Sequence, residues 1–288
     1  MIHVLIPAHN RLELTINCLS SLKNQKDYDN LNIIIIDDAS TDGTEEYLKK
    51  NFPEVTILKG DGSLYWCGAI HFGVEHVVKI CKIEDWVLVV NNDVELSPNA
   101  ISELVKISKK KERKVLSGAL TLSSEDRQTI IKSGTVVENW MLNKTKHPLK
   151  GLNVNEVDVI EPINVDFLTG RCLLHPVEVF SKVGNYDSKT FIHYGGDDEF
   201  SMRVKKFGYL TLLCPSSIVF LKPNDPIVPE KISIKKLFHV LFSIKSSSNI
   251  VNKFKLTMKV VPFYAKLSFF IVGLIKSFYI FSKNEIKK

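Results

Sequence analysis

Residues 31–44 read LNIIIIDDASTDGT, an apolar run that ends in two aspartates and a polar turn. β-Branched residues favour strands, and a strand that is apolar on both faces is typical of a parallel sheet covered on both sides. Asp42 stands three residues before Glu45, which predicts a helix start with Asp42 as its cap. The stretch therefore predicts a buried strand, an acidic turn and a helix, in that order.

The same alternation continues on both sides of this stretch. Short apolar runs predict strands, and apolar residues at helical spacing predict helices. The predicted elements of the first half are strands over 2–7, 31–36, 55–58 and 86–90 and helices over 11–22, from 42, over 70–81 and from 97. This order predicts a doubly wound, Rossmann-like α/β half, in which ligands lie at the carboxyl ends of the strands.

The second half predicts a mixed continuation of the sheet and a change of character near the C-terminus. The expected elements are strands over 115–121, 173–175, 210–213 and 218–221, a helix over 199–206 and a surface loop over about 143–160. We therefore expect an α/β domain over 1–225 and a helical, basic appendage over 226–288.

Charge is distributed unevenly along the chain. The 288 residues carry a net charge of +6, but residues 227–288 hold twelve Lys and two Glu, a net of +10, which leaves −4 for residues 1–226. This asymmetry disfavours nucleic acid as a partner and favours an anionic membrane surface. Five cysteines without CxxC spacing and an N-terminus without a signal-peptide pattern lead us to expect a reducing, cytoplasmic location.

The apolar C-terminal residues 262–281 are interrupted by Lys266 and Lys276, so the longest uncharged run is the nine residues 267–275. A bilayer-spanning helix needs about 20 apolar residues. We therefore expect an amphipathic anchor lying on the inner face of the cell membrane. The alternative is a helical subdomain that packs on the body or on a second copy of the chain, as in a homodimer.

Two polar motifs directly follow predicted strands of the first half. Asp37 and Asp38 can accept hydrogen bonds from a ribose hydroxyl or a base N–H. Asn92 and Asp93 end the fourth strand, where a carboxylate can hold a hard divalent cation together with a diphosphate. The alternative for each motif is an ordinary set of turn residues.

A third motif, GGDDEF over residues 195–200, sets three carboxylates side by side before a predicted helix. Carboxylates this close raise one another's pKa unless a cation is near, which is typical of functional sites. The preceding glycines allow a ligand to approach the backbone. The alternative is that Asp197, Asp198 and Glu199 only complement the dipole of the helix.

A glycine-rich loop, GDGSLYWCG over residues 60–68, begins like a dinucleotide-binding fingerprint. Tyr65 stands where that fingerprint requires a small residue, which disfavours a dehydrogenase. Tyr65 and Trp66 either stack on a sugar or belong to the core. The histidines are more typical of structural roles, but His193 lies beside the acidic motif and is a candidate substrate contact.

Together these motifs resemble glycosyltransferase family 2, which has the GT-A fold, over about residues 1–222. The residues that carry the resemblance are IPAHNR (6–11), DDASTDGT (37–44), Asn92-Asp93, TGR (169–171), VGNYD (183–187), GDDEFSMR (196–203) and Gly208-Tyr209. The loop over 60–73 resembles the rhamnosyltransferase branch, which acts on bacterial surface polysaccharides such as capsule or O-antigen.

The resemblance implies an inverting transfer of a sugar from dTDP-rhamnose or a UDP-sugar to a glycan or lipid-linked acceptor. It implies Asp197 as the catalytic base, with Asp198 as the alternative and Glu199 beside the acceptor. The nucleotide-sugar would contact Pro7, Ala8, Asn10, Arg11, Asp37, Asp38, Gly68, Asn92 and Asp93. The acceptor or the sugar would contact Tyr65, Trp66, Gly170, Arg171 and His193. Asp93 would bind Mg²⁺ or Mn²⁺.

Two positions depart from the family pattern. Gly196 stands where the family usually has Glu, and Leu221 stands near the place where many members have a metal-binding His. The second departure leaves open whether a metal is used, with Lys222 as a partial electrostatic substitute. Two alternatives remain: a catalytically degenerate binding protein, and a nucleotidyltransferase, which would usually have glycine in the loop over 7–11.

Overall fold

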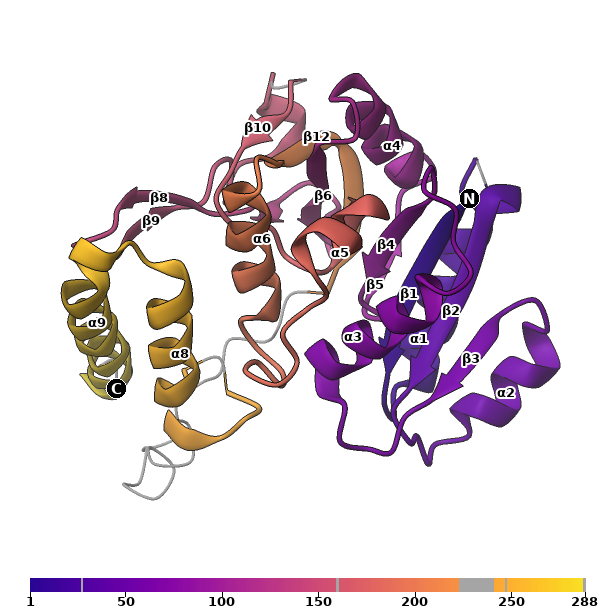
Figure 1. Cartoon of the computed structure of the whole chain (residues 1–288), viewed down its shortest axis with the longest axis horizontal. Coiled ribbons are helices and arrows are strands. Elements are labelled where there is room, and N and C mark those ends of the chain that lie inside the picture. Colours follow the sequence, from indigo (N-terminus) through magenta and orange to yellow (C-terminus); the bar gives the residue numbers. More distant parts are fainter. Residues whose placement is uncertain (27, 159–160, 223–240, 247, 287–288) are drawn as a thin grey trace.

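The computed structural model describes residues 1–26, 28–158, 161–222, 241–246 and 248–286, and its centre is a ten-stranded mixed sheet (Figure 1). The strands pair in the order β10-β12-β6-β11-β4-β1-β2-β3, with β5 on β12 and β7 on β6. Their bounds are β1 Ile2–Ala8, β2 Leu31–Asp37, β3 Thr56–Lys59, β4 Trp86–Val90, β5 Val94–Leu96, β6 Val115–Ser123, β7 Ile130–Lys132, β10 Ile163–Asn164, β11 Cys172–Pro176 and β12 Leu210–Leu221. A separate hairpin consists of β8 Val136–Asn139 and β9 Lys144–Lys146.

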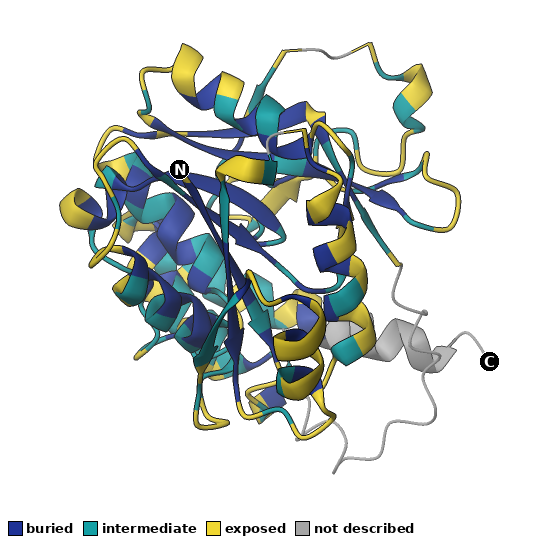
Figure 2. Ribbon diagram, turned by 90° about the vertical axis from the view of Figure 1, so that its right-hand side faces the viewer, coloured by how far each residue is buried: buried dark blue, intermediate teal, exposed yellow. Residues whose placement is uncertain are grey.

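Helices cover both faces of this sheet, and the central strands between them are buried (Figure 2). The helices of the body are α1 Leu12–Lys23, α2 Thr44–Asn51, α3 Tyr65–Val77, α4 Ala100–Lys110, α5 Glu178–Val183 and α6 Gly196–Lys206. Within β2, Ile34 and Ile36 join the core under α3, α5 and α6, whereas Ile33 and Ile35 join the core under α1, α2 and α4. The mixed α/β fold expected from the apolar strands is therefore confirmed.

The topology brings three polar segments to one edge of the sheet. Strands β1, β2, β3 and β4 run parallel, so their carboxyl ends lie at the same edge. Strand β11 runs antiparallel between β4 and β6, with Leu173 opposite Val89. The residues before β11 therefore lie beside the residues after β4. As a result, segments 37–38, 91–93 and 169–171 lie along the same edge of the sheet.

The helix expected over 70–81 begins and ends earlier in the chain than predicted. It is α3, and it begins at Tyr65 because the N–H of Tyr65 donates to Oδ2 of Asp38 (3.0 Å). It ends at Val77, where the C-cap Val78 donates its N–H to the carbonyl of Val74. Tyr65 and Trp66 consequently lie on the first turn of a helix rather than in a loop.

Two elements in the second half of the chain also differ from those predicted from the sequence. The two strands predicted over 210–213 and 218–221 form one strand, β12, whose register against β6 shifts between Cys214 and Ile218. The predicted loop over 143–160 includes β9 and a short 3₁₀ turn. The bulge in β12 and these short elements lack the regular apolar alternation on which sequence-based prediction relies.

Two C-terminal helices, α8 Ile250–Val260 and α9 Lys266–Ile286, form a hairpin beside the body (Figure 1). The rings of Phe254 and Phe270 pack across it, with centroids 5.4 Å apart. The ring of Trp140, between β8 and β9, lies 5.7 Å from that of Phe269. The predicted domain boundary at 225/226 lies outside the described residues. No helix in the described ranges has the length and apolarity needed to cross a membrane.

Lysines fasten this hairpin to the body. Lys255 donates to the carbonyl of Thr190 (3.2 Å), and Lys259 forms an ion pair with Asp187. Lys276 of α9 donates to the carbonyl of Asn143 (2.5 Å). Much of the described basic charge of the hairpin therefore faces the protein, whereas apolar side chains face outward.

Candidate active site

Asp38 joins the turn after β2 to the glycine-rich loop. Its Oδ1 accepts a hydrogen bond from the N–H of Gly62 (2.8 Å), and its Oδ2 accepts one from Tyr65. Its own N–H donates to the carbonyl of Ala8 (2.9 Å). A Cβ on Gly60 would lie 2.5 Å from Oδ1 of Asp38, so the loop requires glycine there. Asp38, a predicted nucleotide contact, therefore also fixes the loop that starts α3.

The loops after β1 and β2 form a single surface. Asn10 has a left-handed backbone (φ 51°), and its Oδ1 accepts from the N–H of Thr41 (2.7 Å). The N–H of Asn10 donates to the hydroxyl of Ser40 (3.0 Å), and Asp37, which is buried, accepts from the N–H of Ser40 (3.1 Å). Two segments predicted to bind the nucleotide are thus held together.

Asp93 carries an oxygen without a partner. Its Oδ1 is buried and accepts no hydrogen bond from a described residue, whereas its Oδ2 lies 3.6 Å from Nη1 of Arg11. The neighbouring Asn92 is buried, and its amide donates to the hydroxyl of Thr15 (3.0 Å). A free carboxylate oxygen suits a hard cation. In the described residues, however, no three His, Cys, Asp or Glu side chains converge on one point, so a cation would take its other ligands from the substrate.

Trp66 and Gly170 together hold the predicted base. The indole N–H of Trp66 donates to Oδ1 of Asn91 (2.8 Å). A Cβ on Gly170 would lie 2.1 Å from Cζ2 of Trp66, so the indole excludes any larger residue. The N–H of Gly170 then donates to Oδ2 of Asp197 (3.1 Å). Three segments distant in sequence meet at this carboxylate.

The first turn of α6 packs tightly on the first turn of α3. A Cβ on Gly196 would lie 2.5 Å from Sγ of Cys67. The thiol of Cys67 thus fills the space that the family's Glu side chain would need. Gly195 precedes it with a left-handed backbone (φ 91°), which glycine adopts without strain. The departure at Gly196 therefore has a steric reason.

Asp197 and Asp198, which follow Gly196, are both half-buried, but their surroundings affect their pKa values differently. Burial raises the pKa of Asp197, but the N–H groups of Gly170 and Asp198 and the charge of Arg171 oppose this rise. Burial, and then the charge of Asp197, raises the pKa of Asp198 to about 8. The pair titrates as a unit, and Asp197 is the member that keeps its charge more readily.

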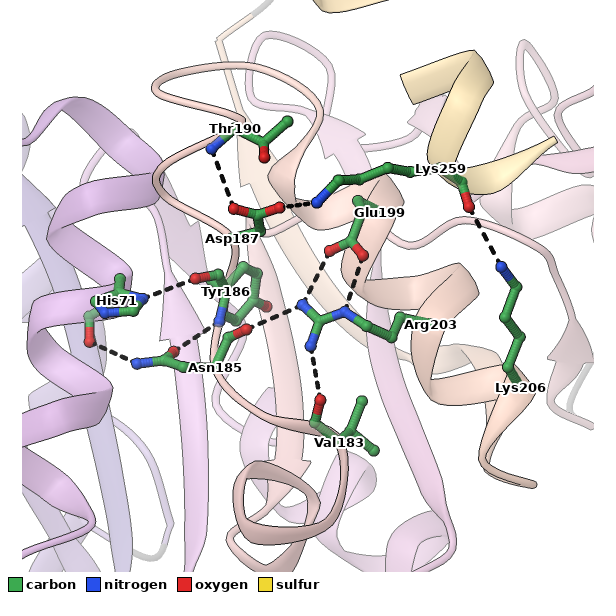
Figure 3. A network of polar contacts seen from close by, with 10 residues as sticks. All are labelled: His71, Val183, Asn185, Tyr186, Asp187, Thr190, Glu199, Arg203, Lys206 and Lys259. Carbon is green, nitrogen blue, oxygen red and sulfur yellow. Dashed lines mark hydrogen bonds and ion pairs between the residues drawn. The ribbon is translucent and has the colours of Figure 1, made fainter. Parts of the chain in front are cut away.

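The side chain of Glu199 binds Arg203 (Figure 3). Its Oε1 accepts from Nε (2.8 Å) and its Oε2 from Nη2 (2.9 Å) of Arg203. Arg203 also donates to the carbonyls of Val183 (2.8 Å) and Asn185 (2.9 Å). Both oxygens of Glu199 thus accept hydrogen bonds from Arg203 within α6, and Arg203 in turn binds α6 to the end of α5. This arrangement favours a positioning role over the acceptor contact expected from the sequence.

The loop between α5 and α6 is fixed from two sides (Figure 3). On the α3 side, Nδ1 of His71 bonds the carbonyl of Tyr186 (2.7 Å), and the amide of Asn185 donates to the carbonyl of His71 (2.9 Å). On the α8 side, Asp187 pairs with Lys259. The loop leads directly into Gly195, so both contacts bear on the position of Asp197.

Three further residues were predicted to contact the substrates: His193, Gly68 and Pro7. His193 has a buried Nδ1 without a hydrogen-bond partner among the described residues, and its ring lies 5.9 Å from that of Tyr65. Burial, then Lys245 and Arg11, lowers the pKa of His193, which favours the neutral ring. Gly68 lies within α3, and its N–H already bonds the carbonyl of Leu64 (3.1 Å). Pro7 is half-buried near the end of β1.

The geometry thus gathers most predicted site residues at one edge of the sheet but leaves Glu199 and Gly68 with internal partners. Sequence reasoning missed Asn91, which anchors Trp66, and Cys67, which excludes a side chain at 196. Asn91 directly precedes Asn92 and Asp93 in the sequence, so its position after β4 was a usable signal. Nothing in the sequence around Cys67 indicates its contact with α6.

Comparison with known families agrees with this arrangement. The model of Glycosyl transferase family 2 matches residues 3–170, which include β1, β2, β4 and Gly170. The chain belongs to glycosyltransferase family 2. It is similar to the N-acetylglucosaminyl-diphospho-decaprenol L-rhamnosyltransferase of Mycobacterium tuberculosis (strain CDC 1551 / Oshkosh), with 25% identity over 205 residues. That match covers 66% of this chain and 66% of the relative, just under two thirds of the relative's length.

Solved structures share the fold. GalNAc-T7 with UDP, GalNAc and Mn²⁺ superposes with a TM-score of 0.61 at 18% identity, over 84% of this chain and 47% of that chain. The mannosyltransferase PcManGT from Pyrobaculum calidifontis, with GDP-Man and Mn²⁺, gives a TM-score of 0.55 at 14% identity, over 96% of this chain and 69% of the other. At these identities the likeness extends to the GT-A-type fold alone.

Proposed function

We propose that this chain is an inverting glycosyltransferase that uses a nucleoside-diphosphate sugar. The observation that carries the proposal is Asp197, a half-buried carboxylate held by the N–H of Gly170 at the edge of the sheet where Asp38 and Asp93 also lie. Membership of family 2 supports the reaction class. Similarity to a rhamnosyltransferase supports dTDP-rhamnose as the donor, with a UDP-sugar as the alternative.

In the proposed reaction Asp197 accepts the proton and the nucleoside diphosphate is the leaving group. An acceptor hydroxyl loses its proton to Asp197 while its oxygen attacks the anomeric carbon. The bond from that carbon to the diphosphate breaks, and the nucleoside diphosphate leaves with the electron pair. Mg²⁺ or Mn²⁺, when bound at Asp93, would offset the charge of the diphosphate. Asp37, Asp38, Asn10 and Arg11 would orient the nucleotide.

A thermal-shift screen tests donor binding. A true donor at 100 times its Kd adds about 2.7 kcal/mol of stability to the folded state. We expect one sugar nucleotide among UDP-, GDP- and dTDP-sugars to raise the melting temperature, with a larger shift if Mn²⁺ participates. Nucleoside monophosphates are the control, because they lack the diphosphate. Failure of every sugar nucleotide to shift the transition would contradict the proposal.

The acceptor we propose is a lipid-linked glycan on the inner face of the cell membrane, in surface polysaccharide synthesis. The relative's name includes a diphospho-decaprenol acceptor, which supports this class. The C-terminal hairpin supports it independently, because it exposes an apolar stripe that begins just before α9 and continues along it. The stripe, spaced at every fourth residue, comprises Phe263 (90% exposed) in the 3₁₀ turn Phe263–Ala265 and Leu267 (75%), Ile271 (46%) and Ile275 (60%) in α9.

Co-sedimentation with phosphatidylglycerol vesicles tests the membrane contact. The double variant Phe263→Ser with Leu267→Ser removes two large apolar side chains that the membrane would bury. It should therefore weaken vesicle binding at least about tenfold. Ile83→Ser is the matched control, because Ile83 is 65% exposed and lies before β4, away from the hairpin. Unchanged vesicle binding would contradict membrane docking. A change in sedimentation from dimer to monomer would instead assign the stripe to a second copy of the chain.

A further inference from the structure

Three cations, Lys132, Lys150 and Arg171, gather on one side of the predicted base. Lys132 ends β7 and pairs in register with Thr121 of β6. Arg171 directly precedes β11, which runs antiparallel to β6 with Leu173 opposite Gly118. Two residues back from Leu173 correspond to two residues forward from Gly118, so Arg171 lies opposite Leu120, the residue before Thr121.

Lys150 follows β9 and lies at the base of the β8–β9 hairpin, near Lys132. The N–H of Gly151 donates to the carbonyl of Ile130 (2.8 Å), which ties this segment to β7. Lys132 precedes the hairpin and Lys150 follows it, so the hairpin has a lysine at each side of its base. Partial burial lowers the pKa of Lys132, and the positive charges of Arg171 and then Lys150 lower it further.

None of the three side chains has an ion pair or hydrogen bond with the described part of the chain. The Nε of Arg171 is buried and has no acceptor. By contrast, Lys205 pairs with Asp166 (2.6 Å) and Arg113 with Glu178 (3.4 Å). Lys132 and Lys150 are exposed, and Asp197 offsets part of the charge of the half-buried Arg171. The buried Nε of Arg171 is a donor left without an acceptor among the described residues, which is unfavourable unless a ligand supplies one.

The cluster adjoins the reacting centre. The carbonyl of Arg171 accepts from the N–H of Asn91 (3.1 Å), and the preceding Gly170 holds Asp197. On the other side, Trp140 and Asn143 of the β8–β9 hairpin contact Phe269 of α9. The cations therefore lie between the predicted base and the hairpin that carries the apolar stripe.

We propose that Lys132, Lys150 and Arg171 bind a diphosphate. Two lysines supply point charges and the guanidinium supplies a planar pair of donors, a combination that suits phosphate oxygens. The position favours the diphosphate of a lipid-linked acceptor, whose sugar would then lie at Asp197 and whose lipid would lead toward α9. This identity of the ligand rests on the proposed function; the diphosphate of the donor is the other source of the same chemistry.

Titration calorimetry with two probes distinguishes these sources. We expect Lys132→Ala with Lys150→Ala to weaken binding of farnesyl diphosphate by about tenfold or more, because charge-assisted hydrogen bonds are lost. Binding of UDP should not change if the site belongs to the acceptor, and it should weaken equally if the site serves the donor. Farnesol binding should be the same in both proteins.

Lys111→Ala is the matched control, since Lys111 is exposed and follows α4 at the opposite end of β6. The loss of affinity should shrink as salt is raised, because partly exposed charges are screened. Unchanged affinity for both diphosphates in the double variant, or an equal loss in Lys111→Ala, would overturn the proposal. The titrations need no sugar transfer, so an inactive protein that still binds diphosphate through these lysines would refute only the proposed function.

Discussion

Asp197→Asn should lower kcat by about a thousandfold, within the range of about 10²–10⁴ that a general base contributes. Asn retains one oxygen that can accept the N–H of Gly170 and loses only the acceptor for the N–H of Asp198, so the fold of the site should persist while the proton acceptor is lost. The affinity for the donor, measured by thermal shift, should stay the same, because Asp197 is assigned to the acceptor hydroxyl. Steady-state assays of sugar transfer measure the change in kcat.

Asp198→Asn is the matched variant. The raised pKa of Asp198, about 8, keeps that carboxyl protonated at pH 7, where Asn is a close neutral substitute. We therefore expect kcat within a few-fold of wild type at pH 7. The rate should fall as pH drops through the pKa of Asp197, because only its ionised form accepts a proton, and this limb should lie above the ordinary Asp value of 3.8. Equal losses in both variants, or a loss only in Asp198→Asn, would refute Asp197 as the base.

The strands of the first half could be predicted from sequence because their signal is local. The run that forms β2 is apolar on both faces, and its alternate residues do enter the two separate cores. The polar residues after β2 and β4 could be placed at one edge of the sheet, because the carboxyl ends of parallel strands lie at the same edge. Local pattern and tertiary environment agree in this part of the chain.

Other features depend on partners far away in sequence. The start of α3 at Tyr65 depends on Asp38, and the glycine at 196 depends on Cys67. Glu199 was expected beside the acceptor because it adjoins Asp197 in sequence, but its side chain lies on Arg203. The lysines at the base of the β8–β9 hairpin have no distinctive sequence pattern at all. Only the register of β6, β7 and β11 sets them beside Arg171.

The ion pair of Glu199 and Arg203 leads to the second large expected effect. Arg203→Leu leaves a carboxylate, whose side chain is only 8% exposed, without its partner. It also removes the donors to the carbonyls of Val183 and Asn185. Breaking one side of a largely buried pair costs about 3 kcal/mol of unfolding free energy. Urea denaturation measures this loss, and the loop that leads to Asp197 should loosen with it.

Two comparisons separate this charge effect from a simple loss of packing. Adding Glu199→Leu to Arg203→Leu should recover part of the stability, because no buried charge then remains unpaired. Lys144→Ala breaks the exposed pair with Glu138, whose side chains are 65% and 37% exposed, and should cost less than about 1 kcal/mol. If Arg203→Leu costs no more than Lys144→Ala, the pair does not hold α6 against α5. The position of Asp197 must then depend on the other contacts described above, those of Gly170, Cys67, His71 and Lys259.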